Sequence, residues 1–263
     1  MAKQTGTETG TFSVERRARI LDRLRADGSI TVAALATEFD LSTETIRRDL
    51  ISLERAGSLR RVHGGAVLET HRGLVPDVKQ RASLMTSEKA LIAEAAAELV
   101  PVAALVLLDG GTTARALAEV YPLDRATTVV TPSLTVATTL LERPSGVVHT
   151  LGGEVSPRTW SEGGSWTVRA LENIRADIVF LGCSGFSAER GATTSDQVDG
   201  QVKRAMVAAA RRVVVLADSS KIGSQHLTTC AAVDEIDVLV TGRDAEAGEV
   251  ARLRAAGLTV QLV

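Results

Sequence analysis

The chain has 263 residues, of which 44% are hydrophobic, and its 30 Lys and Arg residues nearly balance 32 Asp and Glu residues. This length exceeds that of a typical single domain, and the apolar content suffices for a sizeable core. The formal net charge of -2 excludes a chain that is basic throughout, so any nucleic-acid footprint must be local.

The two cysteines, Cys183 and Cys230, are too few for a disulfide scaffold, and neither has the neighbouring Cys or His of a metal site. We expect both to be small buried side chains in a reducing cytoplasm. No apolar run approaches the length of a membrane span, and residues 1–13 lack the apolar stretch of a signal peptide. We therefore expect a disordered tail at 1–13 and a cytoplasmic protein without membrane contact, metal or cofactor.

Residues 30–67 predict two short helices, a tight junction and a basic hairpin. The first helix has apolar residues at the spacing of one buried face over 32–39, with Thr31 as its expected N-cap. Ser42 can cap the second helix, whose buried face would carry Ile46, Leu50 and Leu53. This order of parts is that of a winged helix-turn-helix, which places its second helix in a DNA major groove.

The opposite face of that second helix carries Thr43, Glu44, Arg47 and Arg48. An arginine can pair with guanine or neutralise a phosphate, and a threonine can bond a phosphate or contact a thymine methyl. Glu44 can read cytosine or simply hold Arg48, its i+4 neighbour.

Residues 58–67 predict a short β-hairpin, the wing, with Gly64-Gly65 at or beside its turn. Two alternatives apply to the whole of 30–67. In one, the two helices form only a solvated helical hairpin with surplus arginines, and in the other the winged helix contacts RNA or protein. The candidate DNA-contacting residues are Ser42, Thr43, Glu44, Thr45, Arg47, Arg48, Arg60, Arg61 and His63.

The remainder of the chain predicts a second domain. Residues 14–68 form the expected DNA-binding domain, 69–86 a linker and 87–263 the second domain. Within it, apolar strands at 103–109, 127–131, 146–153, 177–185, 212–220 and 236–242 alternate with helices at 112–120, 133–142, 166–175, 199–211 and 244–256. Such alternation predicts a parallel sheet covered on both faces, with ligands bound beyond the carboxyl ends of the strands.

The first of these strand ends reads Asp109-Gly110-Gly111-Thr112-Thr113, a glycine turn that leads into a helix. Backbone amides and the helix dipole favour an anion there, and the threonine hydroxyls add donors, so phosphate is the natural occupant. The alternative is that the glycines only close a tight turn and Thr112 only caps the helix.

Small polar residues also follow the other strands and converge on the same rim. The further candidate effector-binding residues are Thr131, Ser133, Gly152, Gly153, Gly185, Asp218 and Lys221. Lys203 is expected at the surface of its helix. Trp160 and Trp166 are expected to pack an irregular loop, with stacking on a sugar ring as the alternative.

TIRRDL at 45–50 and AGSLRRVHGGAV at 56–67 resemble the DeoR family of bacterial transcriptional regulators. The resemblance returns downstream in SEKALIAEAAAELV, LLDGGTTARALAE, VVTPSLTVATTLL, LGGEV, DIVFLGCSGF, VKRAMVAAARRVVVLADSSKIG and DEIDVLVT, and covers nearly all of 14–242. It implies an α/β fold class, in which a small α+β winged helix precedes a larger domain similar to ribose-5-phosphate isomerase with a mainly parallel sheet. It also implies a repressor of a carbohydrate metabolism operon that responds to a phosphorylated sugar or a related metabolite.

Three positions depart from the family pattern. The family commonly has Asp-Ser-Gly-Thr-Thr where this chain has Gly110, Thr-Asn-Ser where it has Pro132, and Thr-Asp where it has Gly242. Because these changes remove polar groups beside the expected pocket, the identity of the effector does not carry over.

The resemblance and the residues together predict a homo-oligomer that binds double-stranded operator DNA, since one winged helix offers few contacts. The alternative is an isomerase-like enzyme with an appended winged helix, for which Asp109, Glu154 or Asp218 would be the general base. A nucleotide-binding enzyme is disfavoured, because neither a P-loop nor a strand-linked G-x-G-x-x-G is present.

Overall fold

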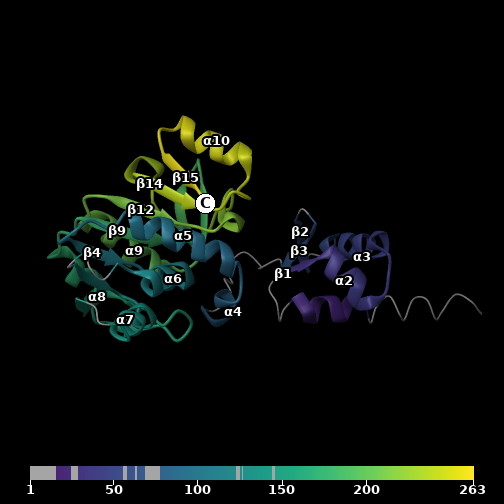
Figure 1. The fold of residues 1–263 in the computed structure, drawn as a ribbon, viewed down its shortest axis with the longest axis horizontal. Helices are drawn as coiled ribbons and strands as arrows, with labels where there is room; N and C mark the ends of the chain where they lie inside the picture. Colours follow the sequence, from purple (N-terminus) through teal and green to yellow (C-terminus); the bar gives the residue numbers. More distant parts are fainter. Residues whose placement is uncertain are drawn as a thin grey trace, which may run out of the picture. The chain divides into compact units, whose positions relative to one another are not determined.

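The computed structural model describes residues 16–24, 29–55, 58–62, 64–68, 78–122, 125, 127–143 and 146–263. The chain divides into two compact units, Met1–Leu84 and Met85–Val263 (Figure 1). The expected tail at 1–13, the first half of the expected linker (69–77) and His63 lie outside the described residues.

The N-terminal unit is a small helical domain with a three-stranded sheet. After a helix over 16–24, its elements are β1 Ser29–Thr31, α2 Val32–Phe39, α3 Thr43–Arg55, β2 Leu59–Val62 and β3 Gly65–Leu68, and then a short helix, α4 Val78–Ala82. The strands are antiparallel in the order β1-β3-β2. The two expected helices and the hairpin are confirmed, whereas β1 was not expected because its three residues carry no usable periodicity.

Apolar residues from the first helix, α2 and α3 form one core with residues of the three strands. Ile20 of the first helix, Leu35 of α2, and Ile46 and Leu50 of α3 are almost fully buried. The hydroxyl of Thr31 accepts a hydrogen bond from the Ala34 amide at 3.1 Å, as expected of an N-cap. Local capping and one apolar face per helix therefore determine this unit.

The C-terminal unit is built on a seven-stranded sheet in the order β15-β14-β12-β9-β4-β5-β6, in which every pair of neighbours is parallel. Its strands are β4 Leu105–Leu108, β5 Thr128–Thr131, β6 Val147–Thr150, β9 Ile178–Gly182, β12 Val213–Leu216, β14 Val238–Thr241 and β15 Thr259–Leu262. Its helices are α5 Thr86–Glu98, α6 Thr112–Val120, α7 Leu134–Leu141, α8 Ser165–Glu172, α9 Gln197–Ala209 and α10 Ala247–Ala255. The predicted α/β class is confirmed, and β15 is an addition to it.

Two hydrophobic cores lie on the two faces of this sheet. Val106 and Leu108 pack with α5, α6 and α7, whereas Leu107, between them, packs with α8, α9 and α10. Alternate residues of a strand point to opposite faces, so a strand buried on both sides must be apolar throughout. The continuous apolar runs in the sequence have this cause.

Short antiparallel pieces complete the unit at the carboxyl ends of the parallel strands. They are β7 Glu154–Val155 with β8 Glu162–Gly163, and the sheet β10-β11-β13 formed by Gly185–Ser187, Gly191–Thr194 and Thr228–Ala231. Two 3₁₀ helices, Ser219–Lys221 and Val233–Glu235, follow β12 and β13. Within the described part of the chain, no helix has the length and apolar character needed to cross a membrane.

Candidate functional site

The junction between α2 and α3 is fixed by backbone and side-chain caps. Asp40 ends α2 in the left-handed conformation, with φ 52°, and the Leu41 amide donates to the Ala36 carbonyl at 3.0 Å. The Ser42 hydroxyl accepts from the Thr45 amide at 3.2 Å and lies 2.9 Å from the Thr45 hydroxyl. Ser42 is therefore the cap of α3 that the sequence predicts.

The exposed face of α3 carries Thr43, Glu44, Arg47 and Arg48. The side chains of Arg47 and Arg48 are 60% and 78% exposed, and both guanidinium groups lie near the Glu44 carboxylate, at 3.9 and 3.5 Å. Exposed ion pairs of this kind contribute little free energy, so the arginines can leave Glu44 for a stronger anion. Of the two roles expected for Glu44, the structure shows pairing with Arg48, and Glu44 pairs with Arg47 as well.

A buried carboxylate fixes α3 against the first helix. Asp49 is 5% exposed and accepts a 2.6 Å hydrogen bond from Arg16 Nε, while Arg17 donates to the Ser52 hydroxyl at 2.8 Å. This contact was not predicted from the sequence, because nothing local marks Arg16 and Asp49 as partners.

The wing is the hairpin of β2 and β3, with Gly64 at its turn in the left-handed region, φ 80°. Arg61 is held back toward α3: its Nε donates to Glu54 at 2.6 Å and its amide donates to the same carboxylate at 3.1 Å. The hydrogen bond from the Arg61 side chain lowers the pKa of Glu54. The backbone of Arg60 lies in β2, and its side chain is outside the described residues.

In the C-terminal unit, Asp109 follows β4 and is 2% exposed. Its carboxylate accepts from the Gly182 amide at 2.8 Å and forms an ion pair with Lys203, which also lies 3.6 Å from Asp199. The expectation that Lys203 lies at the surface is wrong, because the side chain turns inward from α9 to neutralise Asp109. Although burial alone would lower the pKa of Lys203, Asp109 and Asp199 raise it above the usual range of lysine.

The glycine turn after Asp109 leads into α6 as expected. Gly111 has φ 101° and stands at the N-cap without any side chain to accept from the first amides of the helix. The Thr113 hydroxyl in that first turn is buried and has no hydrogen-bond partner in the described part of the chain. An uncapped helix N-terminus with a buried, unsatisfied hydroxyl is suited to an anion.

The polar residues after β5 are engaged within the protein. The Thr131 hydroxyl accepts from the Ser133 amide at 3.0 Å, and the Ser133 hydroxyl accepts from the Val136 amide at 3.4 Å. Both residues are fully buried, so their hydroxyls shape the turn into α7.

The carboxylate of Glu162, at the start of β8, binds the backbone of the glycine turn after β6. Glu162, 8% exposed, accepts from the Leu151 and Gly152 amides, each at 2.8 Å. The Gly152 carbonyl accepts from the Thr167 hydroxyl at 2.6 Å, and a Cβ on Gly153 would collide with that hydroxyl. Glu162 was not among the predicted site residues, although a glutamate inside an otherwise small and polar loop was the available signal.

Charged residues cluster after β12. Lys221 Nζ lies 3.6 Å from Asp218, and the Ser220 hydroxyl donates to the same carboxylate. Burial alone would raise the pKa of Asp218, but Lys221, Ser220 and Lys89 outweigh it and lower that pKa. Lys89 is 5% exposed on α5 and was not among the residues predicted for the site.

Gly185 begins β10 beside the loop around Ser224. A Cβ at this glycine would lie 2.6 Å from the Ser224 carbonyl oxygen, so the position has room only for glycine. Its own carbonyl accepts from the Thr193 hydroxyl at 3.1 Å.

The two tryptophans do not pack as expected. Trp160 and Trp166 are 46% and 74% exposed. The loop before β8 closes through its own backbone, since the Trp160 amide donates to the Ser156 carbonyl at 2.8 Å and Ser156 donates to Ser161 at 2.9 Å. Because the backbone closes this loop, an indole is not needed to stabilise it.

Both cysteines are free and buried, as the sequence predicts. Burial raises the pKa of Cys183 to about 11 and that of Cys230 to about 12. Among the described residues, no group of three or more His, Cys, Asp or Glu side chains is arranged to hold a metal ion.

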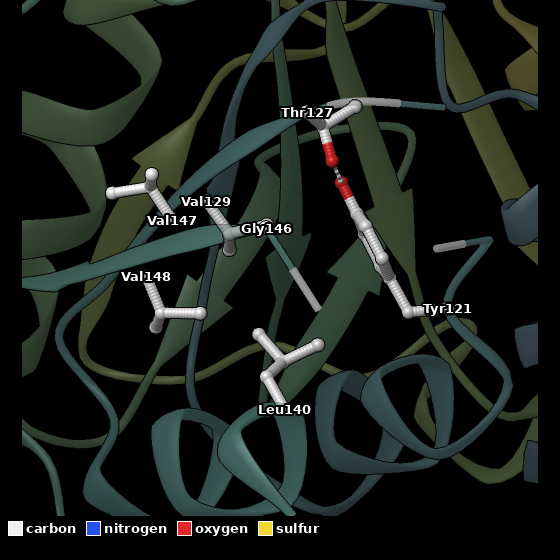
Figure 2. A pocket seen from close by; sticks show the side chains of 7 residues that line it. All are labelled: Tyr121, Thr127, Val129, Leu140, Gly146, Val147 and Val148. Carbon is white, nitrogen blue, oxygen red and sulfur yellow. Dashed lines mark hydrogen bonds between the residues drawn. The ribbon is translucent and has the colours of Figure 1, made fainter. Parts of the chain in front are cut away.

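A small pocket lies at the opposite, amino-terminal end of β5 and β6. Figure 2 shows Tyr121, Val129 and Leu140 among its lining residues, with the Tyr121 hydroxyl 3.0 Å from that of Thr127. Its volume is about 10 Å³, enough for about one water molecule and too small for a sugar.

Comparison with known proteins gives two family matches. Residues 16–72 match the DeoR-like helix-turn-helix domain, and residues 85–243 match the DeoR C terminal sensor domain.

Curated relatives match over most of their length. The putative aga operon transcriptional repressor of Escherichia coli O157:H7 is 33% identical, with 98% of this chain and 97% of that protein covered. The HTH-type transcriptional repressor GlcR of Bacillus subtilis (strain 168) is 34% identical, with 88% and 89% covered. Among solved structures, ribose 5-phosphate isomerase A from Methanocaldococcus jannaschii is 18% identical over 51% of this chain and 52% of that chain, with a TM-score of 0.37.

Proposed function

Because the chain belongs to the DeoR family of transcriptional regulators, we propose that it represses a carbohydrate-metabolism operon in the cytoplasm and that a phosphorylated sugar modulates its DNA affinity. The observation that carries the ligand class is the uncapped N-terminus of α6, where Gly111 offers no side chain and the buried Thr113 hydroxyl has no partner among the described residues. The names of the aga operon repressor and of GlcR support the regulatory role.

The DNA contacts would come from the face of α3 that carries Thr43, Arg47 and Arg48, with Arg60, Arg61 and His63 of the wing on the flanking phosphates. Ser42, Thr45 and Asp49 would position this face, since their side chains are engaged in capping α3 or anchoring it. One such face makes few contacts, so a homo-oligomer would place two of them in successive major grooves.

The effector would lie at the carboxyl ends of the parallel strands, where ligands of such sheets bind. Its phosphate would accept hydrogen bonds from the amides of Gly111, Thr112 and Thr113, and the buried Thr113 hydroxyl would be a further donor. Lys89 and Lys221 add positive charge after β12, where Asp218 can accept from sugar hydroxyls. Glu162 already accepts hydrogen bonds from the amides of Leu151 and Gly152, so that turn would shape the pocket without binding the phosphate itself.

We further infer that the chain does not isomerise sugars. An isomerase needs a carboxylate free to take a proton from a sugar carbon. Asp109 is paired with Lys203, Asp218 is paired with Lys221, and Glu154 is exposed on the two-residue strand β7. Asp109 is thus already engaged by a buried cation, and despite burial the charge of Lys221 lowers the pKa of Asp218, which suits binding better than catalysis.

The test is fluorescence anisotropy on DNA from the upstream region of the gene, titrated with the full chain and a panel of sugar phosphates and matching free sugars. The expected result is specific binding that one phosphate changes and its free sugar does not. Lack of sequence-specific binding at low salt would contradict the proposal, and turnover of an aldose or ketose phosphate would favour the enzyme.

A further inference from the structure

The first turn of α5 is held by the loop that follows β12. Both oxygens of the Glu88 carboxylate are used there: one accepts from the Ser219 amide at 2.6 Å and the other from the Ser219 hydroxyl at 2.9 Å. These two residues are 131 positions apart in the chain. A bidentate, charge-assisted contact of this kind is stronger and more directional than a neutral hydrogen bond.

Two further observations show that this contact is closely fitted. Gly242, at the end of β14, leaves the space that Glu88 fills, because a Cβ at this position would collide with the Glu88 carboxylate. Lys89, next in sequence, is buried on the same helix and acts on Asp218, the residue before Ser219. Glu88 thus binds Ser219, and the charge of Lys89, the next residue of α5, acts on the residue before Ser219.

The same turn of α5 is where the chain enters the C-terminal unit. Met85 precedes α5 in the left-handed conformation, φ 52° and ψ 36°, and caps the helix without a side-chain hydrogen bond. A residue other than glycine is rarely found in this region unless the surroundings hold it there. Upstream of Met85 the chain leads through α4 to the DNA-binding unit.

We propose that Glu88 is a positioning residue that transmits effector occupancy from the loop after β12 to the start of α5. This proposal rests on the effector site proposed above and adds the route by which the site acts. A ligand held by Asp218 and Lys221 would move the 3₁₀ helix Ser219–Lys221. Because both donors of Ser219 are held by Glu88, the first turn of α5 and the backbone at Met85 would move with it.

The test measures hydrogen–deuterium exchange of the full chain with and without inorganic phosphate, and then with hexose and pentose phosphates. In the wild-type chain, residues 219–222 and residues 85–92 should gain protection together, by up to about tenfold at ten times the dissociation constant. In Glu88→Gln, 219–222 should keep this protection and 85–92 should lose it. Glu94→Gln, a change at an exposed position of the same helix, is the matched control and should behave as the wild type.

Each other outcome has a distinct meaning. Protection of 219–222 without 85–92 in the wild type would overturn the coupling and leave the proposed effector site standing. Protection of neither segment, and none at 111–113, by any compound would overturn the effector site and the coupling with it, whereas protection at 111–113 alone would overturn the coupling. Shared protection that persists in Glu88→Gln would reduce Glu88 to a structural residue.

A second variant and a second readout guard against a folding defect. Ser219→Ala removes one of the two donors and should weaken the shared protection in part, and thermal melting shows whether each variant is folded. In the DNA assay at saturating effector, Glu88→Gln should keep the ligand-free affinity and lose most of a change that is typically about 5- to 150-fold. An unchanged effector response in a folded Glu88→Gln would contradict the proposal.

Discussion

The ammonium group of Lys203 on α9 is buried against the carboxylate of Asp109 at the end of β4. The pair joins the helix layer on one face of the sheet to the strand end from which the glycine turn begins. Since both side chains are at least nine-tenths buried, neither charge has water as an alternative partner.

Replacing Lys203 with methionine is expected to lower the free energy of unfolding by about 3–5 kcal/mol, because Asp109 would remain buried and uncompensated. Urea unfolding measures this loss. Arg204→Met, which removes an exposed cation of the same helix, should cost less than about 1 kcal/mol. The double variant Asp109→Asn with Lys203→Met should recover part of the loss, and a double variant as unstable as the sum of the single changes would show that the two groups do not interact.

Removing the α3 arginines should weaken operator binding. Arg47→Ala and Arg48→Ala are each expected to cost about 1–3 kcal/mol, and a lost phosphate contact should reduce the salt slope by about one. Anisotropy titrations over a series of salt concentrations measure both quantities. Arg175→Ala, an exposed arginine of the C-terminal unit, is the control, and equal losses in all three variants would contradict a specific role for α3.

Glu54 is expected to restrain DNA binding, because its carboxylate pairs Arg61 of the wing in the absence of DNA. Glu54→Gln should free the guanidinium group, raise the affinity for non-specific DNA a few-fold and steepen its salt dependence. The pairing lowers the pKa of Glu54, so the pair persists at neutral pH and mutation is the practical way to break it. Glu98→Gln on α5 is the control, because it changes the net charge by the same amount. An equal rise in its affinity for non-specific DNA would show that only the net charge matters.

Local chemistry explains which parts of the fold were predictable. Thr31 and Ser42 act as caps on the amides three residues ahead, and the apolar faces of α2 and α3 repeat within a few residues. The parallel strands are predictable because burial on both faces demands continuous apolar runs. β15 and the β10-β11-β13 sheet were missed, since their short mixed sequences depend on neighbours that are distant in the chain.

The candidate site was predictable as a set of strand ends but not as a set of contacts. Asp109 meets Lys203 across 94 positions and Glu88 meets Ser219 across 131. No periodicity relates such partners, and a lysine on an amphipathic helix has the same sequence pattern whether it turns inward or outward. Lys203, Glu88 and Glu162 were missed for this reason.

The buried thiols should make the protein sensitive to alkali. Their pKa values in the fold are about 11 and about 12, against 9.0 for an unperturbed thiol. As pH rises above 9, the thiols of the unfolded chain ionise while those of the folded chain keep their protons, so stability falls, by about 1 kcal/mol per pH unit for each thiol. Urea unfolding between pH 8 and 10 measures the slope. Cys230→Ala should make it shallower, and an unchanged slope would contradict the role of that thiol.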